Sequence, residues 1–142
     1  MLSLDAVRRA PKVLLHDHLD GGLRPATIVE LARDVGYTGL PTHDAAELAR
    51  WFHASAASGS LPLYLRGFAH TIAVMQTPEA LERVADEAGE DLANDGVVYA
   101  EIRFAPVFHQ QRGMNLEQVL DALLRGFARA EQIGRASCRE RV

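Results

Sequence analysis

Apolar positions along the chain follow two different periods, and their order predicts an α/β fold. The apolar run around Leu14, bounded by Pro11 and by Gly21-Gly22, predicts a short buried strand over 12–19. The segment VVYAEIRFA is rich in β-branched and aromatic residues, and it predicts a second strand over 97–105. The residues between and after these strands repeat their apolar positions at helical spacing.

Five helices are predicted from this spacing. Pro25 suits the first turn of the first helix, and Asp44 with Glu47 resembles a capping box for the second. Thr77 and Asn115 are expected to cap the fourth and the fifth. The apolar stripes of the five helices are, in chain order, Ile28, Leu31 and Val35; Leu48, Trp51 and Phe52; Leu61, Leu65, Phe68, Ile72 and Met75; Leu81, Val84, Ala88 and Leu92; and Leu116, Val119, Leu120, Leu123 and Phe127.

The order strand, helices, strand, helix predicts parallel pairing of the two strands in a βα-type sheet. A parallel sheet needs several neighbouring strands and cover on both faces, so two strands do not make a complete one. We therefore expect residues 1–133 to be the opening part of a larger α/β domain.

The last nine residues, GRASCRERV (134–142), interrupt the final helical pattern after Ile133. They contain three arginines and have no apolar periodicity. The segment resembles translated vector or adapter sequence, so we expect a non-native tail; a frayed polar C-terminus is the alternative. Resequencing across codons 130–145 would distinguish the two.

Composition excludes several classes of partner. A net charge of −4 without a basic cluster argues against nucleic acid, and no segment approaches the ~18 apolar residues that span a bilayer. The first residues lack the apolar core of a signal peptide, so a cytoplasmic location is expected. The single cysteine, Cys138, excludes a disulfide framework and a cysteine-based zinc site. The oligomeric state stays open.

Two histidines and an aspartate follow the first apolar run at every second position. Side chains alternate along a strand, so His16 and His18 share one face, and Asp20 joins them if the strand geometry continues. Sites in parallel α/β folds lie at the carboxyl ends of strands, and Gly21-Gly22 would let the backbone approach a ligand there. Imidazoles with an oxygen ligand suit Zn²⁺. A His-x-His pair by itself favours two structural or surface histidines, and the position at a strand end with Asp and Gly-Gly following makes the metal site an equal alternative.

Three segments in order resemble the adenosine deaminase family: PKVLLHDHLDGGLRPATIVELA (11–32), SLPLYLRGFAHTIAVMQ (60–76) and DGVVYAEIRFAP (95–106). The resemblance extends from Pro11 to about Ile133. It implies a zinc-dependent (β/α)₈ TIM barrel, of which this chain carries the first two βα units, with extra lid helices between strands 1 and 2. It also implies hydrolysis of the 6-amino group of adenosine or deoxyadenosine, which releases ammonia and an inosine.

The resemblance also implies a role for individual residues. His16 and His18 would bind zinc, His18 would also border the nucleoside, and Asp20 would hydrogen-bond the ribose. Four apolar lid positions would cover the purine: Leu61, Tyr64, Leu65 and Phe68, with Tyr64 where many relatives have phenylalanine. The family's third zinc histidine and its acid–base residues lie on later strands. We therefore expect no catalytic residue within this chain, and no activity from it alone.

Other polar residues are interpreted as structural. His109 follows the second strand and is interpreted as a surface loop histidine, because it matches no ligand position of the family. Glu101 and Arg103 share a face of that strand and are expected to form a buried charge pair. The remaining histidines are expected to be exposed or half-buried: His43, His53 and His70.

Three functions stay open at this point. The first is the N-terminal part of an adenosine deaminase, and the second is a deaminase of adenine or of another adenosine-containing metabolite. The third is a non-catalytic partial-barrel module that binds a partner or a metal. The zinc deaminases with an H-x-E and P-C-x-x-C pattern are excluded, because the chain lacks the cysteines that they need.

Overall fold

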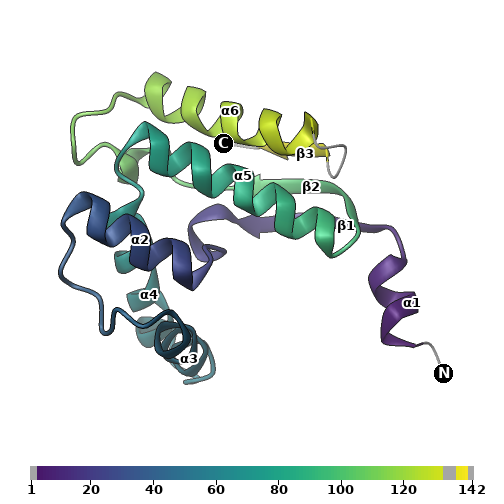
Figure 1. Cartoon of the computed structure of the whole chain (residues 1–142), viewed down its shortest axis with the longest axis horizontal. Helices are drawn as coiled ribbons and strands as arrows, with labels where there is room; N and C mark the ends of the chain where they lie inside the picture. Colours follow the sequence, from purple (N-terminus) through teal and green to yellow (C-terminus); the bar gives the residue numbers. More distant parts are fainter. Residues whose placement is uncertain (1–2, 133–136, 141–142) are drawn as a thin grey trace.

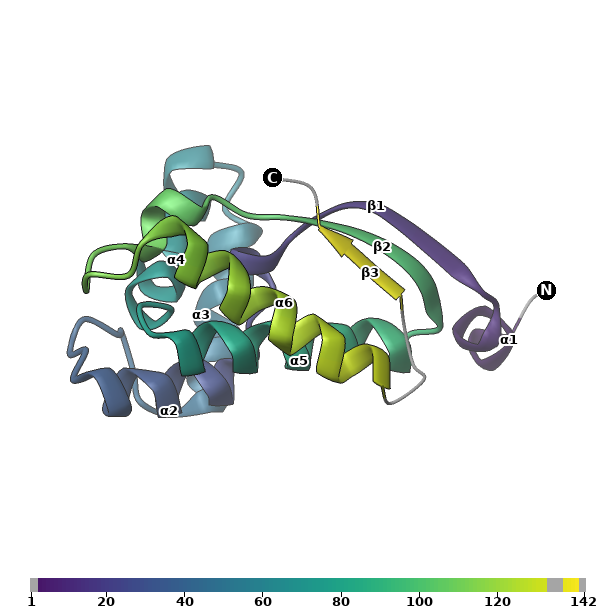
Figure 2. The ribbon, with the colours of Figure 1, turned by 90° about the horizontal axis from the view of Figure 1, so that it is seen from above.

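A parallel sheet with the strand order β1-β2-β3 forms one layer of the structure, and helices lie against one of its faces (Figures 1 and 2). The computed structural model describes residues 3–132 and 137–140. The elements are α1 (Leu4–Arg9), β1 (Lys12–His18), the 3₁₀ turn η1 (Leu19–Gly21), α2 (Pro25–Val35), α3 (Ala45–Ala56), α4 (Leu61–Val74), α5 (Pro78–Asn94), β2 (Val97–Arg103), the 3₁₀ turn η2 (Pro106–His109), α6 (Leu116–Gln132) and β3 (Ser137–Glu140).

The two predicted strands pair in parallel, as expected. The pairing runs from Lys12 opposite Val97 to His18 opposite Arg103. It is irregular between Leu14 and Asp17, where β1 uses one residue more than β2 does. Both strands run toward helices α2, α3 and α4, so those helices gather at the carboxyl ends of the strands (Figure 2).

A third strand was not predicted. Residues 137–140 pair in parallel with β2, with Tyr99 opposite Ser137 and Ile102 opposite Glu140. The expectation of two strands is therefore wrong for the described residues. An edge strand such as β2 offers unpaired backbone groups to any extended segment, so such pairing needs no side-chain pattern. Ile133 and residues 134–136 and 141–142 lie outside the described residues, and the non-native origin of the tail stays a prediction.

Only one face of the sheet is covered by the described helices. Ala100 and Ile102 of β2 are buried beneath α5 and α6. Val13 and Leu15 of β1 are each 59% exposed. The prediction that β1 is buried is therefore wrong for one face of the strand: Leu14 packs against the core, but no described element covers Val13 and Leu15.

The predicted helices all form, and their caps show how the sequence sets their ends. Thr77 Oγ1 accepts a hydrogen bond from the Ala80 backbone N–H at 3.2 Å. At α3, Asp44 caps Glu47 as predicted, but the Glu47 carboxylate bonds to the Thr42 hydroxyl. The full reciprocal capping box occurs at α6 instead, between Asn115 and Gln118, at 2.8 and 3.0 Å.

Three details differ from the sequence-based expectations. The short helix α1 was not predicted; Ser3 caps it by accepting from the Ala6 N–H. Leu116, placed in the buried stripe of α6, is exposed. The expected Glu101–Arg103 pair is not buried, because Arg103 is exposed and Glu101 is half-buried, accepting a hydrogen bond from the Tyr99 hydroxyl. No helix in the described ranges has the length and hydropathy needed to cross a bilayer.

Helices α5 and α6 pack with their backbones unusually close at Gly126. A methyl group on Gly126 would overlap the backbone carbonyl oxygen of Glu82 and would lie 2.7 Å from Cβ of Ala85. Val119, Leu123 and the rest of the buried α6 stripe pack beneath this contact. Glycine is therefore required here for close helix packing and not for its backbone freedom.

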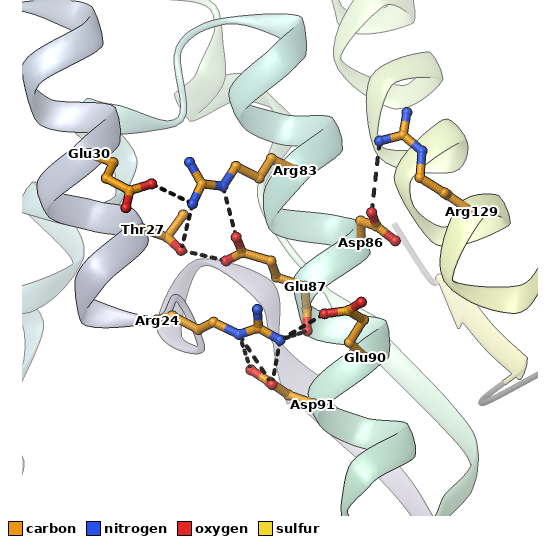
Figure 3. A network of polar contacts seen from close by, with 9 residues as sticks. All are labelled: Arg24, Thr27, Glu30, Arg83, Asp86, Glu87, Glu90, Asp91 and Arg129. Atoms are coloured by element: carbon orange, nitrogen blue, oxygen red, sulfur yellow. Dashed lines mark hydrogen bonds and ion pairs between the residues drawn. The ribbon is translucent and has the colours of Figure 1, made fainter. Parts of the chain in front are cut away.

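Charged side chains on both flanks of α5 attach it to its neighbours (Figure 3). On one flank, Arg24 donates to Asp91 and Glu90, and Arg83 bridges Glu30 and Glu87. The Asp91 carboxylate beside it is the main reason that the pKa of Arg24 rises above its usual range. On the other flank, Arg125 and Arg129 of α6 contact Glu82, and Arg129 also faces Asp86 at 3.8 Å. The same helix is thus held to α2 and to α6.

We expect Gly126→Ala to destabilise the fold. Alanine is intrinsically better than glycine within a helix by about 1 kcal/mol, but the overlap with a backbone atom forces α5 and α6 apart, at a typical cost of about 1–3 kcal/mol. The net loss is measured by urea unfolding. Gly22→Ala is the matched control, since its added methyl group would meet nothing closer than 3.9 Å. An equal or raised unfolding midpoint for Gly126→Ala would contradict the packing.

We expect Glu87→Gln to lower the free energy of unfolding by about 1 kcal/mol at low salt, and by less in 1 M NaCl. Its carboxylate accepts from Thr27 Oγ1 at 2.6 Å and from Arg83 Nε at 2.8 Å, and the amide keeps the shape but loses the charge. Glu90→Gln, which loses one contact with Arg24, is expected to cost less. A Glu87→Gln effect that is independent of salt would argue against an electrostatic origin.

Candidate functional site

His16 and His18 come together at the carboxyl end of β1. Their Nε2 atoms lie 3.2 Å apart, and both side chains are exposed. Two nitrogens bound to one zinc ion at about 2.0–2.1 Å in tetrahedral geometry would lie roughly 3.3 Å apart. The pair therefore has the spacing of two ligands of one cation. Asp17 accepts a hydrogen bond from the His18 backbone N–H at 2.9 Å, which fixes the end of the strand.

Asp20 does not continue the strand. The chain turns into η1 after His18, and Asp20 lies in this turn with 6% of its surface exposed. Its Oδ1 atom has no hydrogen-bond partner within the described part of the chain. Burial raises the pKa of the Asp20 carboxyl, against the effects of a backbone N–H and of the nearby His18 and His109. The condition for Asp20 to join the face of the two histidines is therefore not met, and the turn carries Asp20 inward instead.

Gly21 joins this turn to the predicted lid helix α4. A methyl group at Gly21 would lie 3.3 Å from the Phe68 ring and 3.9 Å from Cβ of His18. The Phe68 ring therefore rests on the turn directly beside the histidine. Tyr64, one helical turn earlier, meets the Phe68 ring edge-to-face with centroids 5.5 Å apart.

A cavity of about 350 Å³ lies between η1, α2, α3 and α4. Asp20, Tyr64 and Phe68 line it together with Gly21 and mainly apolar neighbours. His18 borders a separate, smaller hollow of about 170 Å³ beside Asp17 and Asp91. The structure thus brings three predicted substrate-binding residues to one cavity and leaves the histidine pair outside its lining.

Leu61 and Leu65, the other two predicted lid residues, lie on the solvent side of α4. Leu61 is 67% exposed and Leu65 is 51% exposed, and neither lines the cavity. Their assignment as residues that cover the purine therefore stays a prediction.

His109 is the residue that the sequence-based interpretation placed wrongly. It lies in η2 and is fully buried, with 0% of its surface exposed. Its Nδ1 atom lies 3.1 Å from the Met75 carbonyl oxygen, and no described residue forms a hydrogen bond with its Nε2 atom. Burial lowers the pKa of the imidazole, partly offset by the Met75 carbonyl and by Asp20. The signal in the sequence was its position after a strand parallel to β1, since the ends of both strands meet at one edge.

Gln76 holds the turn that carries His109. Its buried amide donates to the carbonyl oxygens of Ile72 and Phe108, at 2.7 and 2.9 Å, and accepts from the Gln111 N–H at 3.0 Å. The end of α4 and the turn after β2 are therefore joined by buried hydrogen bonds.

The remaining histidines are placed as expected. His43 and His53 are exposed. His70 is half-buried and contacts the Tyr37 hydroxyl at 2.8 Å, and burial lowers its pKa. Within residues 3–132 and 137–140, no group of three or more histidine, cysteine, aspartate or glutamate side chains is close enough to hold a metal ion. The assignment of His16 and His18 as metal ligands therefore stays a prediction.

Comparison with known proteins adds the family. The family model for adenosine deaminase matches residues 11–138. The chain is 62% identical over 132 residues to an adenosine deaminase of Mycobacterium ulcerans and 60% identical over 133 residues to adenosine deaminase 1 of Streptomyces coelicolor. These alignments cover 93% and 94% of this chain but 36% and 34% of the relatives. The chain thus spans about a third of the length of the relatives that it matches.

Solved structures of deaminases have the same arrangement of elements. The adenine deaminase of Arthrobacter aurescens superposes with a TM-score of 0.76 at 29% identity, covering 92% of this chain and 38% of that one. An amidohydrolase from Burkhoderia ambifaria with bound zinc superposes with a TM-score of 0.77 at 24% identity, covering 99% and 38%. The second likeness concerns the fold alone. From the matched family model and the close relatives, the chain belongs to the adenosine deaminase family.

Proposed function

We propose that this chain forms the first βα units of a zinc-dependent (β/α)₈ barrel that hydrolytically deaminates adenosine and deoxyadenosine. The observation that carries the proposal is the His16–His18 pair, with 3.2 Å between its Nε2 atoms, at the end of a strand that leads into the Asp20 turn. Sites in parallel α/β folds lie at this end of the strands. Family membership supplies the reaction class.

His16 and His18 would hold the zinc ion, and further ligands would have to come from outside the described residues. Both imidazoles are exposed to solvent at the carboxyl end of β1, so an ion can reach them without disturbing the fold. Bound zinc lowers the pKa of a coordinated water, so that hydroxide is available near neutral pH.

The residues of this chain would bind and orient the nucleoside. A ribose hydroxyl would donate to Asp20, whose carboxylate is held in a buried turn where a charge-assisted hydrogen bond is strong. Tyr64 and Phe68 would cover the base with aromatic surface on one wall of the cavity. A volume of about 350 Å³ suits part of a small-molecule site, and its mainly apolar lining excludes water.

A deaminase of adenine is the second candidate. The observation that favours it is the superposition on the adenine deaminase of A. aurescens, at a TM-score of 0.76. The two candidates differ in what Asp20 does, because adenine has no ribose hydroxyl to donate to it. The buried carboxyl group of Asp20, which lines the cavity, favours the nucleoside, because a ribose hydroxyl can donate to it.

We expect a chimera to deaminate adenosine in preference to adenine. In it, residues 11–132 of this chain replace the matching segment of the M. ulcerans relative, to which the chain is 62% identical. His16→Ala in this chimera removes one proposed zinc ligand. We expect it to lower zinc affinity and deaminase activity by more than the loss of about 10–100-fold that is typical when a hydrogen-bond partner of a ligand is removed. Zinc content and the loss of adenosine absorbance are measured together. His43→Ala, at an exposed site away from β1, is the matched control. Preference for adenine would favour the second candidate.

We expect the 142-residue polypeptide alone not to deaminate adenosine. The described residues supply two histidine ligands, which leaves a tetrahedral site incomplete, so zinc is held weakly. The measurement is the zinc-dependent change in adenosine absorbance, with the His16→Ala polypeptide as the background. Turnover clearly above that background would show that the polypeptide assembles a working site by itself.

A further inference from the structure

Two buried acceptor atoms at the carboxyl edge of the sheet have no hydrogen-bond partner among residues 3–132 and 137–140. They are Oδ1 of Asp20 and Nε2 of His109. The side chains that carry them are 6% and 0% exposed. Buried polar atoms are nearly always paired, because an unpaired one gives up its contacts with water and gains nothing in return. The two side chains stand on η1 and η2, which follow adjacent parallel strands at the same edge of the sheet, so one partner can serve both atoms.

The orientation of His109 is fixed from its other nitrogen. The Met75 carbonyl can only accept, so Nδ1 at 3.1 Å carries the proton and donates it. In the neutral imidazole, Nε2 is then an acceptor with a free lone pair. The ring itself is held by its hydrogen bond to Met75, and Gln76 holds the backbone of the same turn through the Phe108 carbonyl. The His109 ring is therefore a rigid group with one acceptor left to use.

Both unpaired atoms are acceptors, so whatever joins them must donate to both. A single buried water molecule does this with its two hydrogens, and buried waters commonly serve such groups. The polypeptide holds one end of this bridge on η1 and the other on η2, at the ends of two adjacent parallel strands.

We propose that His109 is a positioning residue for Asp20. Through the bridging water it fixes one carboxylate oxygen, which leaves the other oriented to accept from the ribose hydroxyl. The ribose part of this inference rests on the proposed function. Because Met75 ends α4, the same imidazole links the helix that carries Tyr64 and Phe68 to the carboxylate. His109 thus sets the position of the ribose contact relative to the aromatic wall of the cavity.

Two substitutions at His109 separate positioning from folding. His109→Asn places an amide where Nδ1 lies, so the Met75 hydrogen bond is kept and the link to Asp20 is lost. His109→Gln places an amide where Nε2 lies, so a donor reaches toward Asp20 while the Met75 bond is lost. If His109 only supported the fold, the asparagine variant would be the milder one.

In the M. ulcerans chimera, we expect His109→Asn to raise KM for adenosine by about 10–100-fold with little change in kcat, and His109→Gln to recover most of the loss. Combining His109→Asn with Asp20→Asn should cost no more than Asp20→Asn alone. Equal KM values for the unsubstituted and His109→Asn chimeras, additive losses, or recovery by asparagine and not by glutamine would overturn the inference.

A second measurement does not depend on activity. Imidazole ¹⁵N spectra of the 142-residue chain are expected to show His109 protonated at Nδ1, with an Nε2 signal that shifts in Asp20→Asn. An unshifted Nε2 signal would overturn the link. An unsubstituted chimera without deaminase activity would count against the proposed function, and the spectra would then decide the Asp20–His109 link by themselves.

Discussion

The parallel pairing of β1 with β2 is the constraint on which the rest of the structure depends. Parallel strands end at the same edge, so the turns η1 and η2 must lie beside each other, although about 90 residues of chain separate them. The connection between the strands has to return along the sheet, and α5 makes that return. Helices α2, α3 and α4 are then left at the carboxyl edge, where they enclose a cavity together with η1.

Desolvation gives this edge its chemical character. Asp20 and His109 are both buried. Burial raises the pKa of the Asp20 carboxyl and lowers the pKa of the His109 imidazole, which favours the neutral form of each group. The exposed His16–His18 pair lies directly before the turn that carries Asp20. One short segment thus carries two solvent-exposed imidazoles and a buried carboxyl group. The proposed function requires both, one to bind a cation and the other to bind a polar ligand.

Most of the fold could be predicted from the sequence, because the helices repeat their apolar residues regularly and begin with recognisable caps. Thr77 and Asn115 start α5 and α6 as expected. Two kinds of feature escaped prediction. The strand β3 is held by backbone pairing, which no side-chain pattern reports. The exposure of Val13 depends on which elements cover the sheet, and a local pattern carries no information about that.

The parts of the site formed by residues close together in the sequence could be predicted. The parts formed by residues that tertiary packing brings together could not. His16 and His18 are two residues apart, so strand alternation was enough to bring their nitrogens together. Asp20 and Phe68 line the same cavity, and the Phe68 ring lies against Gly21, next to Asp20. This arrangement depends on how α4 packs, which the sequence pattern does not show. His109 was misplaced because η2 looks like a surface loop in the sequence. Its burial follows from the tertiary contacts made by Gln76 and Met75.

The charged flanks of α5 have a consequence for how such domains can exchange parts. The helix presents acidic residues to Arg24, at the N-cap of α2, on one side and to Arg129 of α6 on the other (Figure 3). A foreign α2 or α6 without those arginines would leave carboxylates of α5 facing each other without counter-ions. Together with the backbone contact at Gly126, this dependence favours exchange of the segment from α2 to α6 as one piece. Crossovers during recombination are best tolerated at its two ends.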